Sequence, residues 1–407
     1  MVQFLVFLLS YALSQFYRSF LAVIAPELGA DLGLDATGLG TLSMAWFLAF
    51  ALAQFAVGAA LDNLGPRRTM PAFMGVAVVG AAVFASSSSY PSAVAGMVLI
   101  GAGSAAIYMG AVYTFARTVA PEKFAQACSW LLGLGSLGNL LSATPLAYAA
   151  ETLGWRTTFL AIAVLTALSA LLILLLIRDP VPAAPSSTEP APGFWRGLRK
   201  IAGISALWPM VPLIFVSYAV MLAERGLWIG PYFSQVHNLG PTERGNAILA
   251  MAAAMSLGAL LYGPADRLFG TRKWVVIVGT VVTAGLFAAL GFHPQAPLST
   301  SVALVTSIGA AGMTYAVLLA HARAYLPENL LGRGITLINF LFFAGAVALQ
   351  PLSGRAVDAL RAAGHTPAEI FATLHWSFAG LLLAGLLFYL GSQEPDRGQS
   401  ATPSHRR

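Results

Sequence analysis

The sequence predicts an all-α membrane protein with twelve transmembrane helices, arranged as two related six-helix bundles. Three observations support this fold class. Only 9% of the 407 residues are charged and 58% are hydrophobic, apolar runs recur along the chain, and the second half repeats motifs of the first. An ordinary soluble domain carries roughly 25% charged residues. The composition therefore excludes a soluble enzyme, a disordered chain and a nucleic-acid-binding module.

Twelve apolar runs are candidates for membrane helices, each of which needs about 20 mostly apolar residues. The first run lacks a basic leading segment, holds Arg18 and has a later copy, so it is interpreted as a membrane helix rather than a cleaved leader. The twelve predicted spans are 3–26, 38–60, 70–89, 92–116, 124–149, 157–178, 207–233, 243–263, 274–292, 298–322, 333–354 and 369–391.

The distribution of Lys and Arg predicts the orientation of these spans. With both termini in the cytoplasm, 16 of the 22 basic residues fall on the cytoplasmic side. Only Arg156, Arg244, Arg355 and Arg361 fall on the outer side, as the positive-inside rule requires. The net charge of +6 is therefore explained by topology and by anionic lipid, and it gives no sign of a nucleic-acid partner. We expect a multi-pass protein of the plasma (inner) membrane.

A proline-rich segment divides the chain. We expect a six-helix bundle over 1–178, a cytoplasmic linker over 179–205, a second bundle over 206–393 and a cytoplasmic tail over 394–407. Near its end, the linker places apolar and basic residues on opposite helical faces. This pattern predicts a short amphipathic helix on the membrane surface, the alternative being a plain linker end. The residues concerned are Phe194, Trp195, Leu198 and Ile201, opposed by Arg196, Arg199 and Lys200.

The two halves repeat each other at an offset of about 206 residues. Several matches in the same order indicate two copies of one six-helix unit. In transporters, such repeats place the substrate site at their interface near the membrane midplane. The matching motifs are Ser10-Tyr11-Ala12 with Ser217-Tyr218-Ala219, Arg18 with Arg225, Asp62 with Asp266, Ala116-Arg117 with Ala322-Arg323, and Pro145-Leu146 with Pro351-Leu352.

The segment from Gly58 to Arg68, with Asp62, Gly65 and Arg67 in place, resembles the signature loop between helices 2 and 3 of the major facilitator superfamily. Gly154-Trp155-Arg156 before the sixth span is also typical of that family. The resemblance extends over the whole chain through the helix count, the linker and the repeat. It implies the major facilitator fold, with two bundles related by a pseudo-two-fold axis and alternating access by rocking.

The loops after the second and eighth spans are candidate gates. Gly65 permits a tight turn, and Asp62 can accept hydrogen bonds or face the N-terminus of a neighbouring helix. Arg67 and Arg68 can pair with that aspartate or with lipid phosphate, so contacts here can hold the inner side closed. The alternative is a solvated turn that only obeys the positive-inside rule. The equivalent candidates in the second copy, where Tyr262 replaces the expected glycine, are Asp266, Gly270 and Arg272.

Two arginines lie inside predicted spans. Arg18 belongs to a polar stripe on the first span that also holds Tyr11 and Gln15, and Arg225 is its repeat-related partner, with Tyr218 beside it. An arginine near mid-membrane costs roughly 2.5–3.5 kcal/mol on insertion scales. A pseudo-two-fold axis would bring both guanidinium groups to one central cavity. Since guanidinium binds carboxylate or phosphate in bidentate fashion, we infer an anionic substrate.

Further residues qualify this hypothesis. Tyr108 and Tyr315, separated by about 207 residues, can line the same cavity or serve packing alone. Glu224 is the only carboxylate within a predicted span, where it can carry a coupling proton or pair with an arginine. The paired arginines resemble those of the organic-anion and organophosphate branches of the superfamily, which supports an anion without fixing its identity.

The sequence therefore predicts a secondary transporter of a small organic anion, a carboxylate or a phosphate ester, working by alternating access. A proton or counter-anion is a candidate coupling ion. We expect a monomer in the lipid bilayer, with no cofactor, no metal and no enzymatic activity. Two alternatives remain at this stage. One is an exporter of drugs, sugars or neutral metabolites in which the arginines are structural. The more remote one is a membrane-embedded enzyme, although the six histidines are scattered and no G-x-S-x-G motif occurs.

Overall fold

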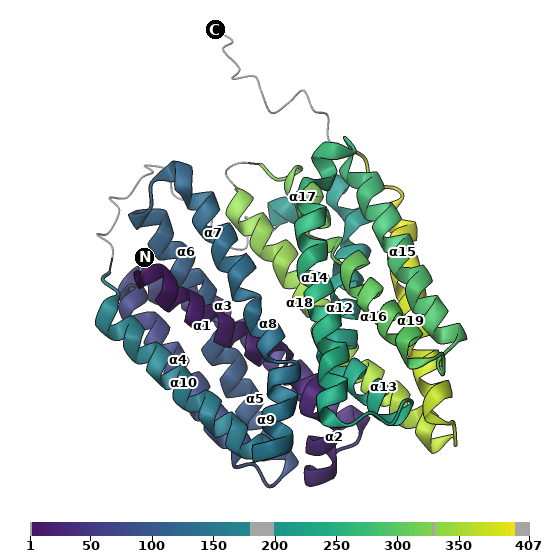
Figure 1. Cartoon of the computed structure of the whole chain (residues 1–407). Helices are drawn as coiled ribbons and strands as arrows, with labels where there is room; N and C mark the ends of the chain where they lie inside the picture. Colours follow the sequence, from purple (N-terminus) through teal and green to yellow (C-terminus); the bar gives the residue numbers. More distant parts are fainter. Residues whose placement is uncertain (1, 180–198, 328–329, 395–407) are drawn as a thin grey trace.

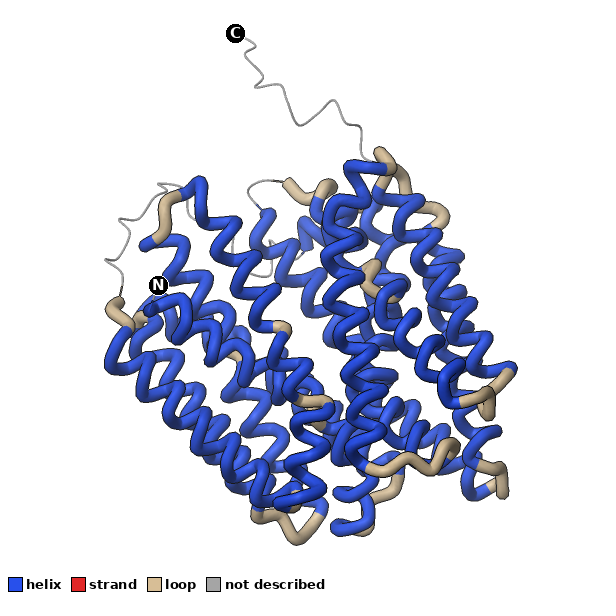
Figure 2. The backbone as a smooth tube through the Cα atoms, viewed as in Figure 1, coloured by secondary structure: helices blue, strands red, loops and turns tan. Residues whose placement is uncertain are grey.

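The computed structural model of the chain describes residues 2–179, 199–327 and 330–394, apart from some side chains within helices (121–122, 125, 266–267 and 331–333). Figure 2 shows helices joined by short loops, and the described residues contain no strand. The first half consists of α1 (Val2–Ser19), α2 (Leu21–Leu32), α3 (Ala36–Leu64), α4 (Pro66–Ala85), α5 (Tyr90–Ser104), α6 (Ala106–Thr118), α7 (Pro121–Gly135), α8 (Leu137–Leu141), α9 (Thr144–Leu153) and α10 (Trp155–Leu176).

The second half begins after the linker. It consists of the 3₁₀ helix η1 (Ser205–Met210), α12 (Val211–Ala223), the π-helix η2 (Glu224–Trp228), α13 (Ile229–Gln235), α14 (Pro241–Leu268), α15 (Arg272–Phe292), α16 (Leu298–Ala311), α17 (Tyr315–Arg323), α18 (Leu331–Ala362) and α19 (Pro367–Tyr389). The predicted surface helix of the linker falls mostly outside the described residues. Only its end is seen, where residues 199–202 are helical and Ile201 is buried.

Among the described residues, ten helical segments are long and apolar enough to cross a membrane, and α1 with α2 forms an eleventh that bends by 51°. The remaining pass runs through α7, α8 and α9 in succession (Figure 1). The all-α fold with twelve passes is therefore confirmed. One predicted boundary is wrong, because the first helix continues past residue 26 to Leu32. Many outward side chains are large and apolar, for example Leu52 and Leu260, as a lipid-facing surface requires.

Two passes are interrupted near the centre of the molecule. The first breaks at Phe20, two residues after Arg18. The fifth breaks around Ser136 and again at Ala143, where the backbone leaves the helical region. Close packing accompanies the second break, since a Cβ added at Gly138 would overlap the backbone oxygen of Ala12 on α1. The equivalent pass in the second half, α18, is one unbroken helix.

The two halves form two bundles that lie side by side (Figure 1). The main contacts between them are α3 with α18 and α14 with α9. The repeat offset maps α3 onto α14 and the fifth pass onto α18, so these two contacts are equivalent under the pseudo-two-fold relation. We call the end that carries the linker and the C-terminal segment the linker end, at the top of Figure 1, and the opposite end the distal end.

Candidate substrate site and gates

Arg18 lies on α1 immediately before the bend, between the two bundles. Its guanidinium carbon is 5.8 Å from the ring centre of Trp46, 5.1 Å from that of Phe50 and 5.5 Å from that of Phe343. Two of these rings belong to α3 and the third belongs to α18, so both bundles contribute to the cation–π contacts. Its Nε atom has no hydrogen-bond partner among the described residues. This leaves Arg18 with an unfilled capacity to bind an anion.

Arg225 occupies the related place in η2, and only 5% of it is exposed. One of its terminal nitrogens donates to the backbone oxygen of Asn139 at 3.0 Å, across the bundle interface. Arg18 is near enough to act on Arg225 electrostatically. The predicted convergence of the two arginines is thus seen in the structure. Each contacts the bundle opposite to its own.

The four predicted tyrosines form two equivalent pairs. The rings of Tyr11 and Tyr108 are centred 5.3 Å apart, and those of Tyr218 and Tyr315 are 4.7 Å apart. Tyr315 interacts electrostatically with the other three tyrosines and with Arg18. The four hydroxyl groups therefore border the space below the arginines. The structure brings these tyrosines together, as the sequence predicts, while leaving their role in binding untested.

Uncharged polar groups complete the centre. Gln15, predicted as part of the site, is 9% exposed and its Oε1 has no partner among the described residues. Gln350 on α18, which the sequence argument missed, is fully buried with its own Oε1 unpartnered and its Nε2 3.4 Å from the Leu222 oxygen. Groups of this kind serve as donors and acceptors for a bound solute.

Glu224 points away from the arginines. Its Oε2 lies 3.5 Å from Nε2 of His375 on α19, and both side chains are fully buried. An ion pair between Glu224 and Arg18 or Arg225 is therefore not present in the described part of the chain. The sequence argument identified Glu224 but not this partner, because His375 is far away in sequence and lies on the last helix.

The distal end is closed by polar contacts between the bundles. Asp358 of α18 accepts hydrogen bonds from the backbone nitrogens of Ala36 and Thr37 and from the Thr37 hydroxyl, at 3.1, 2.7 and 2.7 Å. A second contact joins Glu27 of α2 to Arg244 of α14, whose side chain is 4% exposed. We call these contacts, together with the following two, the distal gate. The other two run from Thr144 to Asn246 and from Thr242 to Glu151.

The predicted gating loops lie at the linker end, and their partners differ from those expected. Arg67 donates its backbone nitrogen to Asp179 at 2.8 Å and its Nε to the Leu174 oxygen at 2.9 Å, both within the first bundle. Asp62 and Arg68 are exposed, and Asp62 makes no ion pair with a described residue. Gly65 has φ +74°, which confirms the tight turn.

The second loop is held in the same way. Lys273, at the position equivalent to Arg67, donates its backbone nitrogen to Glu394 at 2.6 Å, and Thr271 donates to the same carboxylate. Burial opposes this arrangement, but the hydrogen bonds from Thr271, Lys273 and Arg272 outweigh it and lower the pKa of Glu394. Gly270 again has a positive φ, +69°. The side chain of Asp266, the remaining gating candidate, lies outside the described residues.

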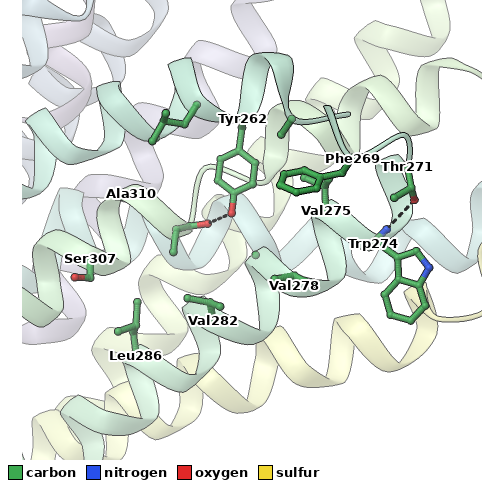
Figure 3. Close-up of a pocket in the computed structure, with 15 residues that line it drawn as sticks. Tyr262, Phe269, Thr271, Trp274, Val275, Val278, Val282, Leu286, Ser307 and Ala310 are labelled. Carbon is green, nitrogen blue, oxygen red and sulfur yellow. Dashed lines mark hydrogen bonds between the residues drawn. The ribbon is translucent and has the colours of Figure 1, made fainter. Parts of the chain in front are cut away.

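A separate cavity of about 790 Å³ opens on the outer surface of the second bundle, between α14, α15 and α16 (Figure 3). Its lining is mostly apolar and includes Trp274 and Phe269, which are 61% and 73% exposed. Tyr262 crosses this cavity and donates its hydroxyl to the Ala311 oxygen at 2.8 Å. The tyrosine that replaces the expected glycine therefore ties α14 to α16. This cavity faces the lipid and is not part of the central site.

Two pseudo-symmetric six-helix bundles with charged groups at their shared centre define a membrane transporter. The Major Facilitator Superfamily profile matches residues 7–348, and the chain belongs to that family. Membership makes the protein a multi-pass membrane transporter rather than an enzyme.

Three proteins illustrate what the chain is similar to. The fosmidomycin resistance protein of Escherichia coli (strain K12) is 26% identical over 370 residues, which cover 89% of this chain and 86% of the relative. An MFS-type efflux pump of Mycolicibacterium smegmatis is 27% identical over 349 residues, 79% of this chain and 76% of that one. A bacterial homolog of the human lysosomal transporter Spinster, solved in an inward-facing and occupied conformation, has a TM-score of 0.80 at 16% identity over 95% of both chains.

Proposed function

We propose that this transporter carries a small organic anion, a carboxylate or a phosphate ester, which binds between Arg18 and Arg225. The observation that carries the proposal is the meeting of two guanidinium groups, one from each bundle, with no carboxylate partner among the described residues. Two like charges in a low-dielectric interior repel each other. An anion placed between them would remove this repulsion and satisfy donors that the protein leaves free.

The shape and chemistry of the surroundings fit such a solute. Aromatic rings hold the plane of the Arg18 guanidinium, which leaves its nitrogen edge for bidentate binding. Tyr11, Tyr108, Tyr218 and Tyr315 supply hydroxyl groups for the uncharged part of the molecule, and Gln15 supplies an amide. We therefore assign these residues to substrate contact.

Transport would proceed by rocking of the two bundles. The distal gate is closed in this conformation, while the loops that hold Asp62, Arg68 and Arg272 contact only their own bundle through described side chains. We propose that the linker end is cytoplasmic, with both termini inside the plasma (inner) membrane, since 16 of 22 basic residues are expected there. Opening the distal gate would then need new contacts between these loops at the linker end. We propose that the monomer is the working unit.

One alternative has specific support. The two curated relatives described above are a resistance protein and an efflux pump, and Arg225 already has a backbone partner. If the arginines only hold the bundles together, the chain would export a neutral or amphiphilic compound. The two proposals differ in whether removing an arginine abolishes binding of anions in particular.

A thermal-shift screen of the purified protein separates them. The panel contains succinate, inorganic phosphate, glycerol phosphate, glucose, and fosmidomycin, which gives the Escherichia coli relative its name. A ligand at about 100 times its Kd stabilises the folded state by about 2.7 kcal/mol. We expect at least one of the three simple anions to raise the melting temperature and glucose to have no effect.

The variants Arg18→Gln and Arg225→Gln should remove the shift and abolish transport while the protein still folds and inserts. Arg18→Lys should retain only part of it, because lysine keeps the charge but loses the planar donor pair. The matched control is Arg117→Gln, since Arg117 is an exposed arginine stacked on Tyr113 away from the centre. Full binding and transport of the anion by Arg18→Gln would refute the proposal.

A further inference from the structure

The pair formed by Glu224 and His375 is fully enclosed. Neither residue has exposed surface, their nearest atoms are 3.5 Å apart, and both carboxylate oxygens and both ring nitrogens lack a hydrogen-bond partner among the described residues. An isolated charge in such a place is expensive. One proton shared by the two groups makes the pair neutral overall, either as carboxylate with imidazolium or as acid with imidazole. The pair is therefore a site that can gain or lose a single proton.

The backbone connects this pair to the proposed anion site. Glu224 and Arg225 are consecutive in η2, whose π-type turn is closed by the Ile229 nitrogen on the Glu224 oxygen. Single π-turns inside α-helices are frequent at functional sites. Here the turn directs Glu224 to α19 of its own bundle and Arg225 to Asn139 of the other. One turn of helix thus carries both a titratable group and an anion-binding group.

The surroundings of the pair contain few other ionisable groups. Tyr232 of α13 lies with its ring centre 5.3 Å from that of His375, and its hydroxyl is 3.3 Å from Nε2 of His237 in the loop that follows. Burial lowers the pKa of His237. Phe287 of α15 and Phe371 of α19 cover the remaining sides of the imidazole without charge.

The charged groups on the other adjacent elements are occupied or belong to the anion site. On α2 and α14, Glu27 and Arg244 pair with each other in the distal gate. On α1, Arg18 acts on Arg225. The charges that the pair responds to most directly are therefore those of the two arginines and of whatever binds them.

We propose that Glu224 and His375 form a proton-binding site whose occupancy is coupled to the anion held by Arg18 and Arg225, so that anion and proton are carried together. This inference rests on the proposed function of the central site. The sign follows from electrostatics, because a bound anion favours the added proton and the added proton favours the anion by the same factor. The proton enters from water at one end and leaves unchanged at the other.

The test uses purified full-length protein with ¹³C-labelled histidine. The His375 signal is assigned by its loss in His375→Gln, and it should change with pH between about 5 and 8. A unit charge about 10 Å from a titrating group, at an effective dielectric constant of about 20, moves its midpoint by about one pH unit. Saturating succinate or inorganic phosphate should raise the His375 midpoint by about that amount. In Glu224→Gln the midpoint should fall, and anion stabilisation should no longer vary with pH.

His293→Gln is the control, because His293 is exposed in the loop after α15 and should leave the His375 titration and its anion response unaltered. A His375 signal that does not titrate in the wild-type protein would overturn the inference without any ligand or variant of Glu224. So would succinate or phosphate that stabilises the protein and leaves the midpoint unmoved. If no anion stabilises the protein at any pH while His375 still titrates, the proposed function fails instead, and the coupling fails with it.

Discussion

Removing the Asp358 carboxylate should open the distal end. Asp358 accepts three hydrogen bonds from the first turn of α3, two of them at 2.7 Å, and its side chain is 23% exposed. Loss of a capping side chain costs about 0.5–2 kcal/mol, and a carboxylate at a helix N-terminus adds about 0.3–1 kcal/mol. The exposed contact of Asp358 with Arg361 at 3.4 Å adds little. The bonds to α3 are worth about 2 kcal/mol in total.

All of this energy belongs to the closed state, because the donor and acceptor lie in different bundles. Asp358→Ala should therefore lower the ratio of distal-closed to distal-open molecules by about 30-fold. Spin labels at Ser89→Cys and Ala363→Cys, in a Cys128→Ser background, report the distance across the distal end by double electron–electron resonance. Ser89 and Ala363 are exposed in distal loops of opposite bundles. The population at long distance should increase in the variant.

Asp35→Ala is the matched control. Asp35 caps the same helix, accepting from Gly38 nitrogen at 2.7 Å, but it lies in the same bundle as that helix. Its loss should weaken α3 in every conformation alike and leave the distance distribution unchanged. If Asp358→Ala gives the wild-type distribution, or if Asp35→Ala opens the distal end as much, the bonds from Asp358 do not hold the gate.

Three other perturbations follow from single contacts. Gly354→Val should favour the distal-open state by about 1–3 kcal/mol, since a Cβ there overlaps the α3 backbone; the same labels measure it, and Gly285→Val, where the space is open, should change nothing. Because the folded pKa of Glu394 is lowered, its bond to Lys273 should stabilise the protein above about pH 4.5 and be lost as the pH falls through the folded value. Melting temperatures of Glu394→Gln and wild type should thus converge in acid; a constant difference would contradict this. Tyr262→Phe should cost about 0.5–1.5 kcal/mol in unfolding titrations by losing its bond to α16, and an unchanged midpoint would show that the bond contributes nothing.

The sequence was sufficient for the fold class and for the central arginines because both depend on regular spacing. Apolar runs give the spans, and a repeat offset transfers Arg18 onto Arg225 and Tyr11 onto Tyr218. The same offset pairs Tyr108 with Tyr315, which the structure places against Tyr11 and Tyr218 respectively.

The remaining features depend on packing between segments that are distant in sequence. The aromatic walls of Arg18 come from two helices nearly 300 residues apart. His375 meets Glu224 only because α19 lies beside η2. Asp179 accepts from Arg67 although nothing local links them. The breaks in the fifth pass follow from its contact with α1, which has no signature in one helix alone.

The crossed placement of the two arginines has a kinetic consequence. Arg18 stacks on a ring of the second bundle and Arg225 reaches the backbone of the first. An empty carrier that rocks between conformations must slide two like charges past each other, whereas a loaded carrier moves a neutralised cluster. The loaded protein should therefore reorient faster than the empty one. Exchange of labelled for unlabelled anion across a vesicle membrane would then outpace net uptake.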